Sequence, residues 1–139
     1  MKHLFVVNPV AGKQKPEEKL RLINEAIDRL PAEQRSRDEF EIYVTEAPMD
    51  ACRHIRETAA DGAELRVYAC GGDGTLNEFV NGAAGLSNVA VTHFPCGTGN
   101  DFIKMFGPGK DRFFDLTELI NGEVRPIDVI KCNDRYSVN

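Results

Sequence analysis

The residues best suited to chemistry lie together at positions 71–78 of this 139-residue chain, as Gly-Gly-Asp-Gly-Thr-Leu-Asn-Glu. They follow an apolar run at 65–70 that is typical of a strand, and the residues from Thr75 onward are typical of the start of a helix. Glycines let a backbone approach a ligand without an obstructing Cβ, and the free N–H groups of a helix N-terminus attract an anion. Asp73 would repel a bare phosphate, so it indicates a role through a metal ion, as a base or as an acceptor for a substrate hydroxyl. We therefore predict phosphate chemistry at this turn.

Three more loops come directly after predicted strands and carry glycine or polar residues. They span residues 8–13, 45–48 and 95–101. In a parallel sheet, ligands bind beyond the carboxyl ends of the strands, where such loops meet. The sequence therefore predicts one site built from four loops.

Strand patterns and helix patterns alternate along the chain, which favours right-handed crossovers and a parallel sheet. The fold class that we predict is α/β, with a mostly parallel sheet between two helical layers (αβα). The expected strands span 3–8, 40–44, 65–70, 89–94 and 127–131, with a hairpin turn at 132–134 leading into 135–138. The expected helices span 20–30, 49–60, a segment starting at Thr75, 100–106 and 112–120.

Composition narrows the function classes. Hydrophobic residues make up 42% of the chain and charged residues 28%, which are ordinary globular values. The net charge is −5 and the basic residues are scattered, so nucleic-acid binding is disfavoured. The four cysteines have no C-x-x-C spacing and there are three histidines, which disfavours a zinc site or a disulfide scaffold and favours a cytoplasmic protein. No apolar run approaches the roughly 20 residues of a membrane span.

The common nucleotide-binding motifs do not match. In a Walker-type loop, Gly-Lys is followed by Ser or Thr, but Gly12-Lys13 is followed by Gln14. The G-x-G-x-x-G pattern fails at both glycine loops, because Gly72-Asp73-Gly74 continues to Asn77 and Gly97-Thr98-Gly99 to Phe102. Walker-type and dinucleotide-fold sites are therefore disfavoured.

Considered together, four blocks resemble the diacylglycerol kinase catalytic domain in their order and spacing. The blocks are Asn8-Pro9-x-Ala11-Gly12, Thr45, the segment 71–78 and Pro95-x-Gly97-Thr98-Gly99-Asn100-Asp101-Phe102. The chain looks like the N-terminal nucleotide-binding domain of a bacterial lipid kinase, related to sphingosine kinases. The resemblance implies a fold like that of NAD kinase, diacylglycerol kinase and phosphofructokinase over residues 1–128. It also implies that residues 129–139 begin the linker or hairpin to a C-terminal β domain that this sequence lacks.

The resemblance implies an ATP- and Mg²⁺-dependent transfer of phosphate to a lipid hydroxyl. Asp73 is the candidate catalytic residue, acting on Mg²⁺ directly or through water, or accepting a hydrogen bond from the lipid hydroxyl. Most metal ligands, and an alternative base, would lie in the missing domain, so we expect the isolated fragment to be inactive. By the family pattern the residues that contact ATP are Asn8, Pro9, Val10, Ala11, Gly12, Thr45, Gly71, Gly72, Asp73, Gly74, Thr75, Leu76, Asn77 and Thr98.

Several residues near these blocks have two interpretations. Lys13 is either a cation beside the phosphates or a solvated loop lysine, and Glu78 either acts in the site or supports the loop. Asn100 and Asp101 are expected to cap the helix that follows them. His93 is expected to be a satisfied core histidine, and Cys70 and Cys96 to be small buried hydrophobic residues.

The expected partners are ATP and a lipid substrate that the cytoplasmic protein reaches transiently at the membrane surface. The oligomeric state stays open, a homodimer included, and so does the identity of the lipid. One alternative is a soluble NAD kinase-like enzyme, since NAD kinases share the Gly-Gly-Asp-Gly-Thr turn. The Asn-Pro loop and the block at 97–102 favour the lipid family. The other alternative is a nucleotide-binding module without catalysis.

Overall fold

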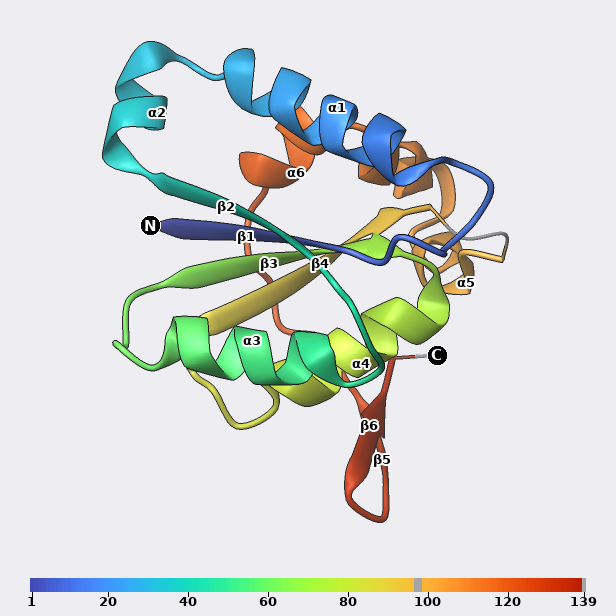
Figure 1. The fold of residues 1–139 in the computed structure, drawn as a ribbon. Coiled ribbons are helices and arrows are strands. Elements are labelled where there is room, and N and C mark those ends of the chain that lie inside the picture. The colour runs from blue at the N-terminus through green and yellow to red at the C-terminus, as the bar shows by residue number, and fades with distance from the viewer. Residues whose placement is uncertain (97–98, 139) are drawn as a thin grey trace.

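The computed structural model describes residues 1–96 and 99–138. Its centre is a sheet of four parallel strands in the order β2-β1-β3-β4 (Figure 1). The two middle strands are almost continuously apolar and are buried, as expected for strands covered on both faces. The strands are β1 (Lys2–Val7), β2 (Glu39–Val44), β3 (Leu65–Gly71) and β4 (Val89–Pro95).

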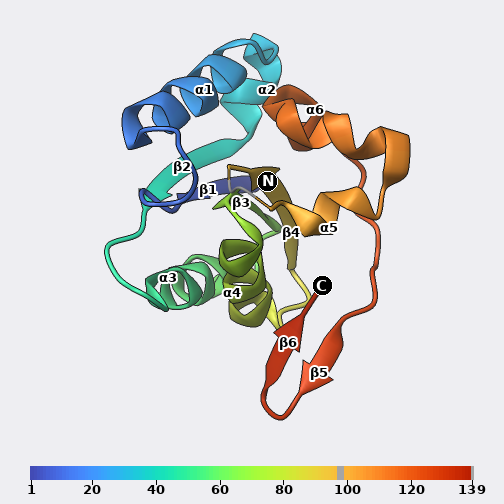
Figure 2. The same ribbon diagram turned by 90° about the vertical axis from the view of Figure 1, so that its right-hand side faces the viewer.

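Helices cover both faces of the sheet, which confirms the α/β fold class with three layers (Figures 1 and 2). One face carries α1 (Pro16–Asp28), α2 (Ala32–Arg37) and α6 (Leu116–Ile120). The opposite face carries α3 (Asp50–Ala59) and α4 (Asp73–Ala83). Among the described residues, no helix has the length and hydrophobicity needed to cross a bilayer.

The two faces of the sheet pack into two separate cores. Side chains alternate between the faces along each strand, so neighbouring residues of β1 belong to different cores. On the side of α3 and α4, the core includes Leu4, Val6, Ala51, Ile55, Val67, Leu76 and Phe79. On the side of α1 and α6, it includes Phe5, Val7, Ile23, Ala26, Tyr68, Leu116 and Ile120.

The segment after β4 is less regular than the first part of the chain. It contains the short helix α5 (Asp101–Lys104), a 3₁₀ helix, η1 (Gly107–Phe114), and α6. A hairpin of β5 (Ile130–Cys132) and β6 (Arg135–Ser137) follows, and it lies beyond α4 in both views (Figures 1 and 2).

Three expectations need correction, and one helix was not expected. The helix expected at 112–120 is divided at Asp115 into the end of η1 and α6. Helix α4 begins at Asp73 rather than at Thr75, so one glycine of the motif lies inside its first turn. The hairpin at the end of the chain is confirmed, but its first strand is shorter than 127–131 and stays outside the parallel sheet. Pro126 just before it has no N–H group to donate to a ladder. Helix α2 was not expected, because it has no buried residue and therefore no apolar periodicity.

Candidate functional site

The loops at the carboxyl ends of the strands surround a hollow of about 500 Å³. This rim of the sheet faces the viewer in Figure 2. Loops after β1, β3 and β4 contribute to its wall, so the expected convergence is confirmed for these three. The hollow is lined by Asn8, Ala11, Gly12, Gly72, Asp73, Gly74, Thr75, Glu78 and Gly99.

The glycines between β3 and α4 serve different purposes. A Cβ added to Gly71 would lie 2.6 Å from Thr75 Oγ1, so the tight packing of the turn requires a glycine there. A Cβ added to Gly74 would meet no atom within 4 Å, so the protein itself does not require a glycine at this position. Gly74 instead adds no side chain to the wall of the hollow at the first turn of α4, where the N–H groups have no partner within the helix. Such a wall suits a close approach by an anionic ligand.

The loop after β1 is fixed to this turn by Asn8. The Asn8 side chain donates from Nδ2 to Thr75 Oγ1 over 3.1 Å and accepts from the Val10 N–H over 3.1 Å. Gly12, at the end of the loop, has a φ of 67°, a left-handed conformation that glycine adopts without strain.

Lys19 supports the same loop from within the protein, a role that the sequence reasoning missed. Its side chain is fully buried, and Nζ donates to the carbonyl oxygens of Asn8 (3.0 Å) and Ala11 (2.6 Å). A signal was present, since Lys19 precedes the buried Ile23 and Ala26 at helical spacing and therefore lies on the apolar face of α1. Lys13 is exposed on the loop itself.

Asp73 connects the two glycine loops. Its Oδ2 accepts a hydrogen bond from the Asp101 N–H (2.7 Å) and its Oδ1 accepts one from the Phe102 N–H (3.1 Å). The carboxylate thus caps the N-terminus of α5 from a distant part of the chain. The expectation that Asn100 or Asp101 provides this cap is wrong, because Asn100 makes no side-chain cap bond and Asp101 pairs with Lys104.

His93 lies directly behind the glycine turn and is fully buried. Its Nε2 is 2.8 Å from the carbonyl oxygen of Gly71, which also accepts the Cys96 N–H over 2.8 Å. Burial lowers the pKa of His93, so the neutral ring donates from Nε2. The expected core histidine is confirmed at this nitrogen, whereas Nδ1 has no hydrogen-bond partner among residues 1–96 and 99–138.

Of the two cysteines beside the turn, Cys70 is buried as expected, whereas Cys96 is half-buried and packs against the edge of the core. Burial raises the pKa of the Cys70 thiol well above its usual value and that of Cys96 to about 11. Both remain protonated at neutral pH and pack as small apolar groups.

Glu78 lines the hollow and also lies beside the neighbouring loop. Desolvation by burial raises the pKa of its half-buried carboxylate, and the nearby Met49 N–H partly offsets that rise. Thr45 lies at the start of that loop, where its N–H and hydroxyl both donate to the carbonyl oxygen of Val7, at 3.0 and 3.4 Å. Both interpretations of Glu78, in the site and in loop support, are therefore consistent with its position.

Comparison with known proteins agrees with this geometry. The family model of the diacylglycerol kinase catalytic domain matches residues 2–132. The chain belongs to the diacylglycerol kinase catalytic domain family. It is 32% identical over 137 residues to a diacylglycerol kinase of Bacillus subtilis, covering 97% of this chain and 43% of that protein. It is 38% identical over 99 residues to a probable lipid kinase YegS-like of Cronobacter sakazakii, covering 69% of this chain and 33% of that protein.

Solved structures of the diacylglycerol kinase family have the same fold. A putative diacylglycerol kinase from Bacillus anthracis aligns with a TM-score of 0.74 and 29% identity, over 97% of this chain and 46% of that one. A second diacylglycerol kinase structure from the same organism aligns with a TM-score of 0.72 and 28% identity, over 97% and 45%. The chain therefore spans less than half the length of these relatives.

The diacylglycerol kinase pattern assigned more residues to ATP than line the hollow. Leu76 is 2% exposed, packs in the core and donates its N–H to Gly72, so it points away from the hollow. Asn77 Oδ1 accepts the Val138 N–H (2.9 Å) and tethers the end of the hairpin to α4. Val10 is 85% exposed and lies outside the lining, as do Pro9 and Thr45. Thr98 lies outside the described residues.

The donors of the hollow fit the cofactors of a diacylglycerol kinase. Backbone N–H groups, the Thr75 hydroxyl and side-chain-free glycines suit the phosphates of ATP. The described residues contain no group of three or more side chains that could hold a metal ion. Mg²⁺ in kinases needs only one or two carboxylates besides phosphate oxygens and water. Asp73 and Glu78 are the carboxylates in the lining and would serve that purpose.

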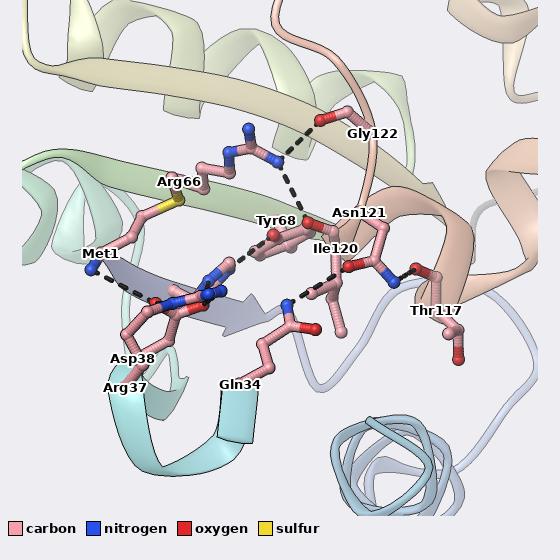
Figure 3. Close-up of polar contacts among 11 residues, drawn as sticks. Met1, Gln34, Arg37, Asp38, Arg66, Tyr68, Thr117, Ile120, Asn121 and Gly122 are labelled. Atoms are coloured by element: carbon pink, nitrogen blue, oxygen red, sulfur yellow. Dashed lines mark hydrogen bonds and ion pairs between the residues drawn. The ribbon is translucent and has the colours of Figure 1, made fainter. Parts of the chain in front are cut away.

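A second polar cluster lies at the opposite, amino-terminal end of the strands (Figure 3). His3 is 2.8 Å from the Tyr68 hydroxyl through Nδ1 and 3.3 Å from Asp38 Oδ2 through Nε2. Arg37 donates to Asp38 and holds the pKa of this carboxyl at about 2. Arg66 donates to the carbonyl oxygens of Ile120 (3.0 Å) and Gly122 (2.8 Å), which fixes the end of α6 to the sheet.

Proposed function

We propose that this chain is the ATP-binding part of a lipid kinase that transfers the γ-phosphate of ATP to a hydroxyl of a diacylglycerol or sphingoid-type lipid. The observation that carries the proposal is the hollow itself, where two glycine-containing loops and the N-terminus of α4 meet around a wall with few side chains. The names of the relatives support a lipid acceptor.

Within this proposal each group has a definite task. The N–H groups at the start of α4 and the Thr75 hydroxyl bind phosphate oxygens, and Asn8 keeps the loop after β1 against the turn. Mg²⁺, when bound with ATP, would neutralise part of the negative charge of the phosphates. Each Asp73 oxygen accepts one backbone N–H and keeps a further lone pair for a metal-bound water or the lipid hydroxyl.

We further propose that the 139 residues bind ATP but do not complete the transfer. The matched relatives are more than twice as long as this chain, and their additional residues are where we place the acceptor site and the remaining metal ligands. The working protein would act in the cytoplasm and meet its lipid transiently at the membrane.

The first test measures ATP binding by isothermal titration calorimetry. We expect the chain to bind ATP in the presence of Mg²⁺ and Gly74→Val to weaken that binding by at least about tenfold, since its side chain enters the hollow. Gly109→Val is the matched control, because a Cβ there also meets no atom within 4 Å while Gly109 lies outside the hollow. Equal affinities of the two variants would contradict the assigned phosphate site.

The second test offers diacylglycerol, sphingosine and NAD as acceptors with radiolabelled ATP. We expect no transfer by the 139-residue chain, and transfer to one of the lipids once the remaining residues of the longer protein are present. Phosphorylation of NAD alone would establish the soluble nucleotide kinase instead.

A further inference from the structure

The segment after the second glycine loop exposes large apolar side chains next to the proposed ATP site. Met105 and Phe106, between α5 and η1, are 62% and 41% exposed, and Phe114, the last residue of η1, is 52% exposed. The Phe106 ring lies 4.9 Å from the ring of Phe113, the residue before Phe114. We call residues 102–114 the aromatic segment.

The aromatic segment borders a cavity that has a volume of about 990 Å³ and runs along β4, the edge strand of the sheet. Phe106 and Phe113 line it, and so do exposed apolar residues after α6, namely Val124, Ile127 and Val129. The apolar surface of the segment therefore continues into the lining of the cavity.

The charge of the aromatic segment is opposite to that of the whole chain. It contains Lys104, Lys110 and Arg112 against one acidic residue, Asp111, while the chain carries a net charge of −5. Lys104 pairs with Asp101 over 2.8 Å and Arg112 with Glu118 over 3.7 Å. Both pairs are solvent-exposed, so exchanging these partners for other anions costs little.

We propose that the aromatic segment docks on the surface of an anionic lipid bilayer. Met105, Phe106 and Phe114 enter the interface, and the basic side chains between them contact lipid phosphates. This inference rests on the proposed function, because a kinase for a membrane lipid has to reach its acceptor at the bilayer. The segment is well placed for this, since α5 begins at the N–H groups that the Asp73 carboxylate holds. Docking would bring the phosphate site to the membrane surface.

The test measures binding of the 139-residue chain to vesicles by co-sedimentation, without ATP. The vesicles consist of phosphatidylcholine alone or mixed with phosphatidylglycerol. We expect binding to the mixed vesicles only, and binding that weakens as salt is raised. The double variant Met105→Ser/Phe114→Ser should lower the partition coefficient about tenfold or more. Its matched control is Met49→Ser, which removes another methionine that is 54% exposed.

Charge variants test the second half of the proposal. Lys110→Gln and Arg112→Gln should each lower binding to the mixed vesicles about fivefold. Arg35→Gln, on the exposed surface of α2, should leave it unchanged. Circular dichroism melting of every variant separates lost binding from lost folding.

Three outcomes would overturn the proposal: no vesicle binding, equal binding to both kinds of vesicle, or full binding by the double variant. A dimer on size-exclusion chromatography that Met105→Ser/Phe114→Ser abolishes would assign this surface to a second copy instead. Because the vesicle assay contains no ATP, its failure would leave the proposed kinase function standing. If the chain bound vesicles but not ATP, the docking proposal would stand and the proposed kinase function would not.

Discussion

The two ends of the same sheet are built in opposite ways. At the amino ends of the strands, polar side chains bind one another and the backbone of neighbouring elements, as Arg66 does with the end of α6. At the carboxyl ends, glycines leave part of the wall without side chains, and the first N–H groups of α4 lie beside a hollow. Both ends are rich in polar groups, but the described side chains at the amino end bind one another and nearby carbonyl oxygens, whereas those at the carboxyl end line a hollow.

This difference indicates that the amino end of the sheet serves the stability of the fold and the carboxyl end serves ligand binding. A buried polar group that loses its partner costs free energy, so the amino end stabilises the fold through its internal hydrogen bonds. The helix N-terminus at the carboxyl end gains by binding an anion instead. Substitutions at the amino end should therefore change stability alone, and those around the hollow should change ATP affinity as well.

The largest effect is expected at the amino end, from Arg66→Met. It removes the donor shared by the carbonyl oxygens of Ile120 and Gly122, and the loss should destabilise the fold by about 1–3 kcal/mol. Urea unfolding measures this, with Arg29→Met, at the exposed position that follows α1, as the control. ATP affinity should not change, and a large loss of affinity in Arg66→Met would break the separation between the two ends.

Asp73→Ala should destabilise the fold by about 1 kcal/mol, the usual cost of losing an N-cap. The loss arises because the N–H groups of Asp101 and Phe102 lose their acceptor. Asp101→Ala is the matched control, since its carboxylate forms a solvent-exposed ion pair with Lys104 and does not cap the helix. If Asp101→Ala proves the more destabilising of the two in urea unfolding, the assignment of the cap to Asp73 is wrong.

Lys19→Met should act mainly on binding. It removes the two hydrogen bonds that order the loop after β1, so we expect ATP affinity to fall by several-fold while stability changes little, because a buried ammonium is also costly to desolvate. Lys13→Met, on the exposed part of the loop, is the control. Calorimetry with ATP distinguishes the two, and a larger loss in Lys13→Met would show that the loop cation contacts the ligand directly.

The smallest effect concerns pH and involves both ends of the sheet. Burial lowers the pKa values of His3 and His93 below that of a free histidine, about 6.5. As the pH falls through this value, the unfolded chain takes up protons that the native state does not, so stability decreases. Thermal melting at several pH values, within about one unit on either side of the free-histidine pKa, measures the slope. The slope should be smaller in His93→Gln, and an unchanged slope would remove His93 from the titration.

Much of the fold was predictable because local patterns and tertiary structure agree. The strands that are buried on both faces stand out as apolar runs, and α1 has its apolar stripe. Helix α2 lacked such a pattern, because none of its residues is buried. The strand expected at 127–131 is shorter and pairs in a separate hairpin, because an apolar β pattern does not specify the strand with which it pairs.

The site was predictable only in part, for a physical reason. Glycine and asparagine suit tight loops because of their residue type, so the sequence alone indicated Asn8 and the glycines that line the hollow. The hydrogen bonds of Asp73 to α5 join residues far apart in the sequence, and no spacing rule reveals them. The same holds for Asn77, whose side-chain oxygen accepts the N–H of Val138, 61 residues further along the chain.

Backbone amide NMR during titration with Mg²⁺–ATP shows directly whether ATP binds at the hollow. We expect chemical-shift changes concentrated there, at Gly12, Gly72, Gly74 and Thr75, with the amides of His3 and Arg66 at the amino end unaffected. Saturable changes centred on the amino-end cluster, or spread evenly over the sheet, would contradict this expectation.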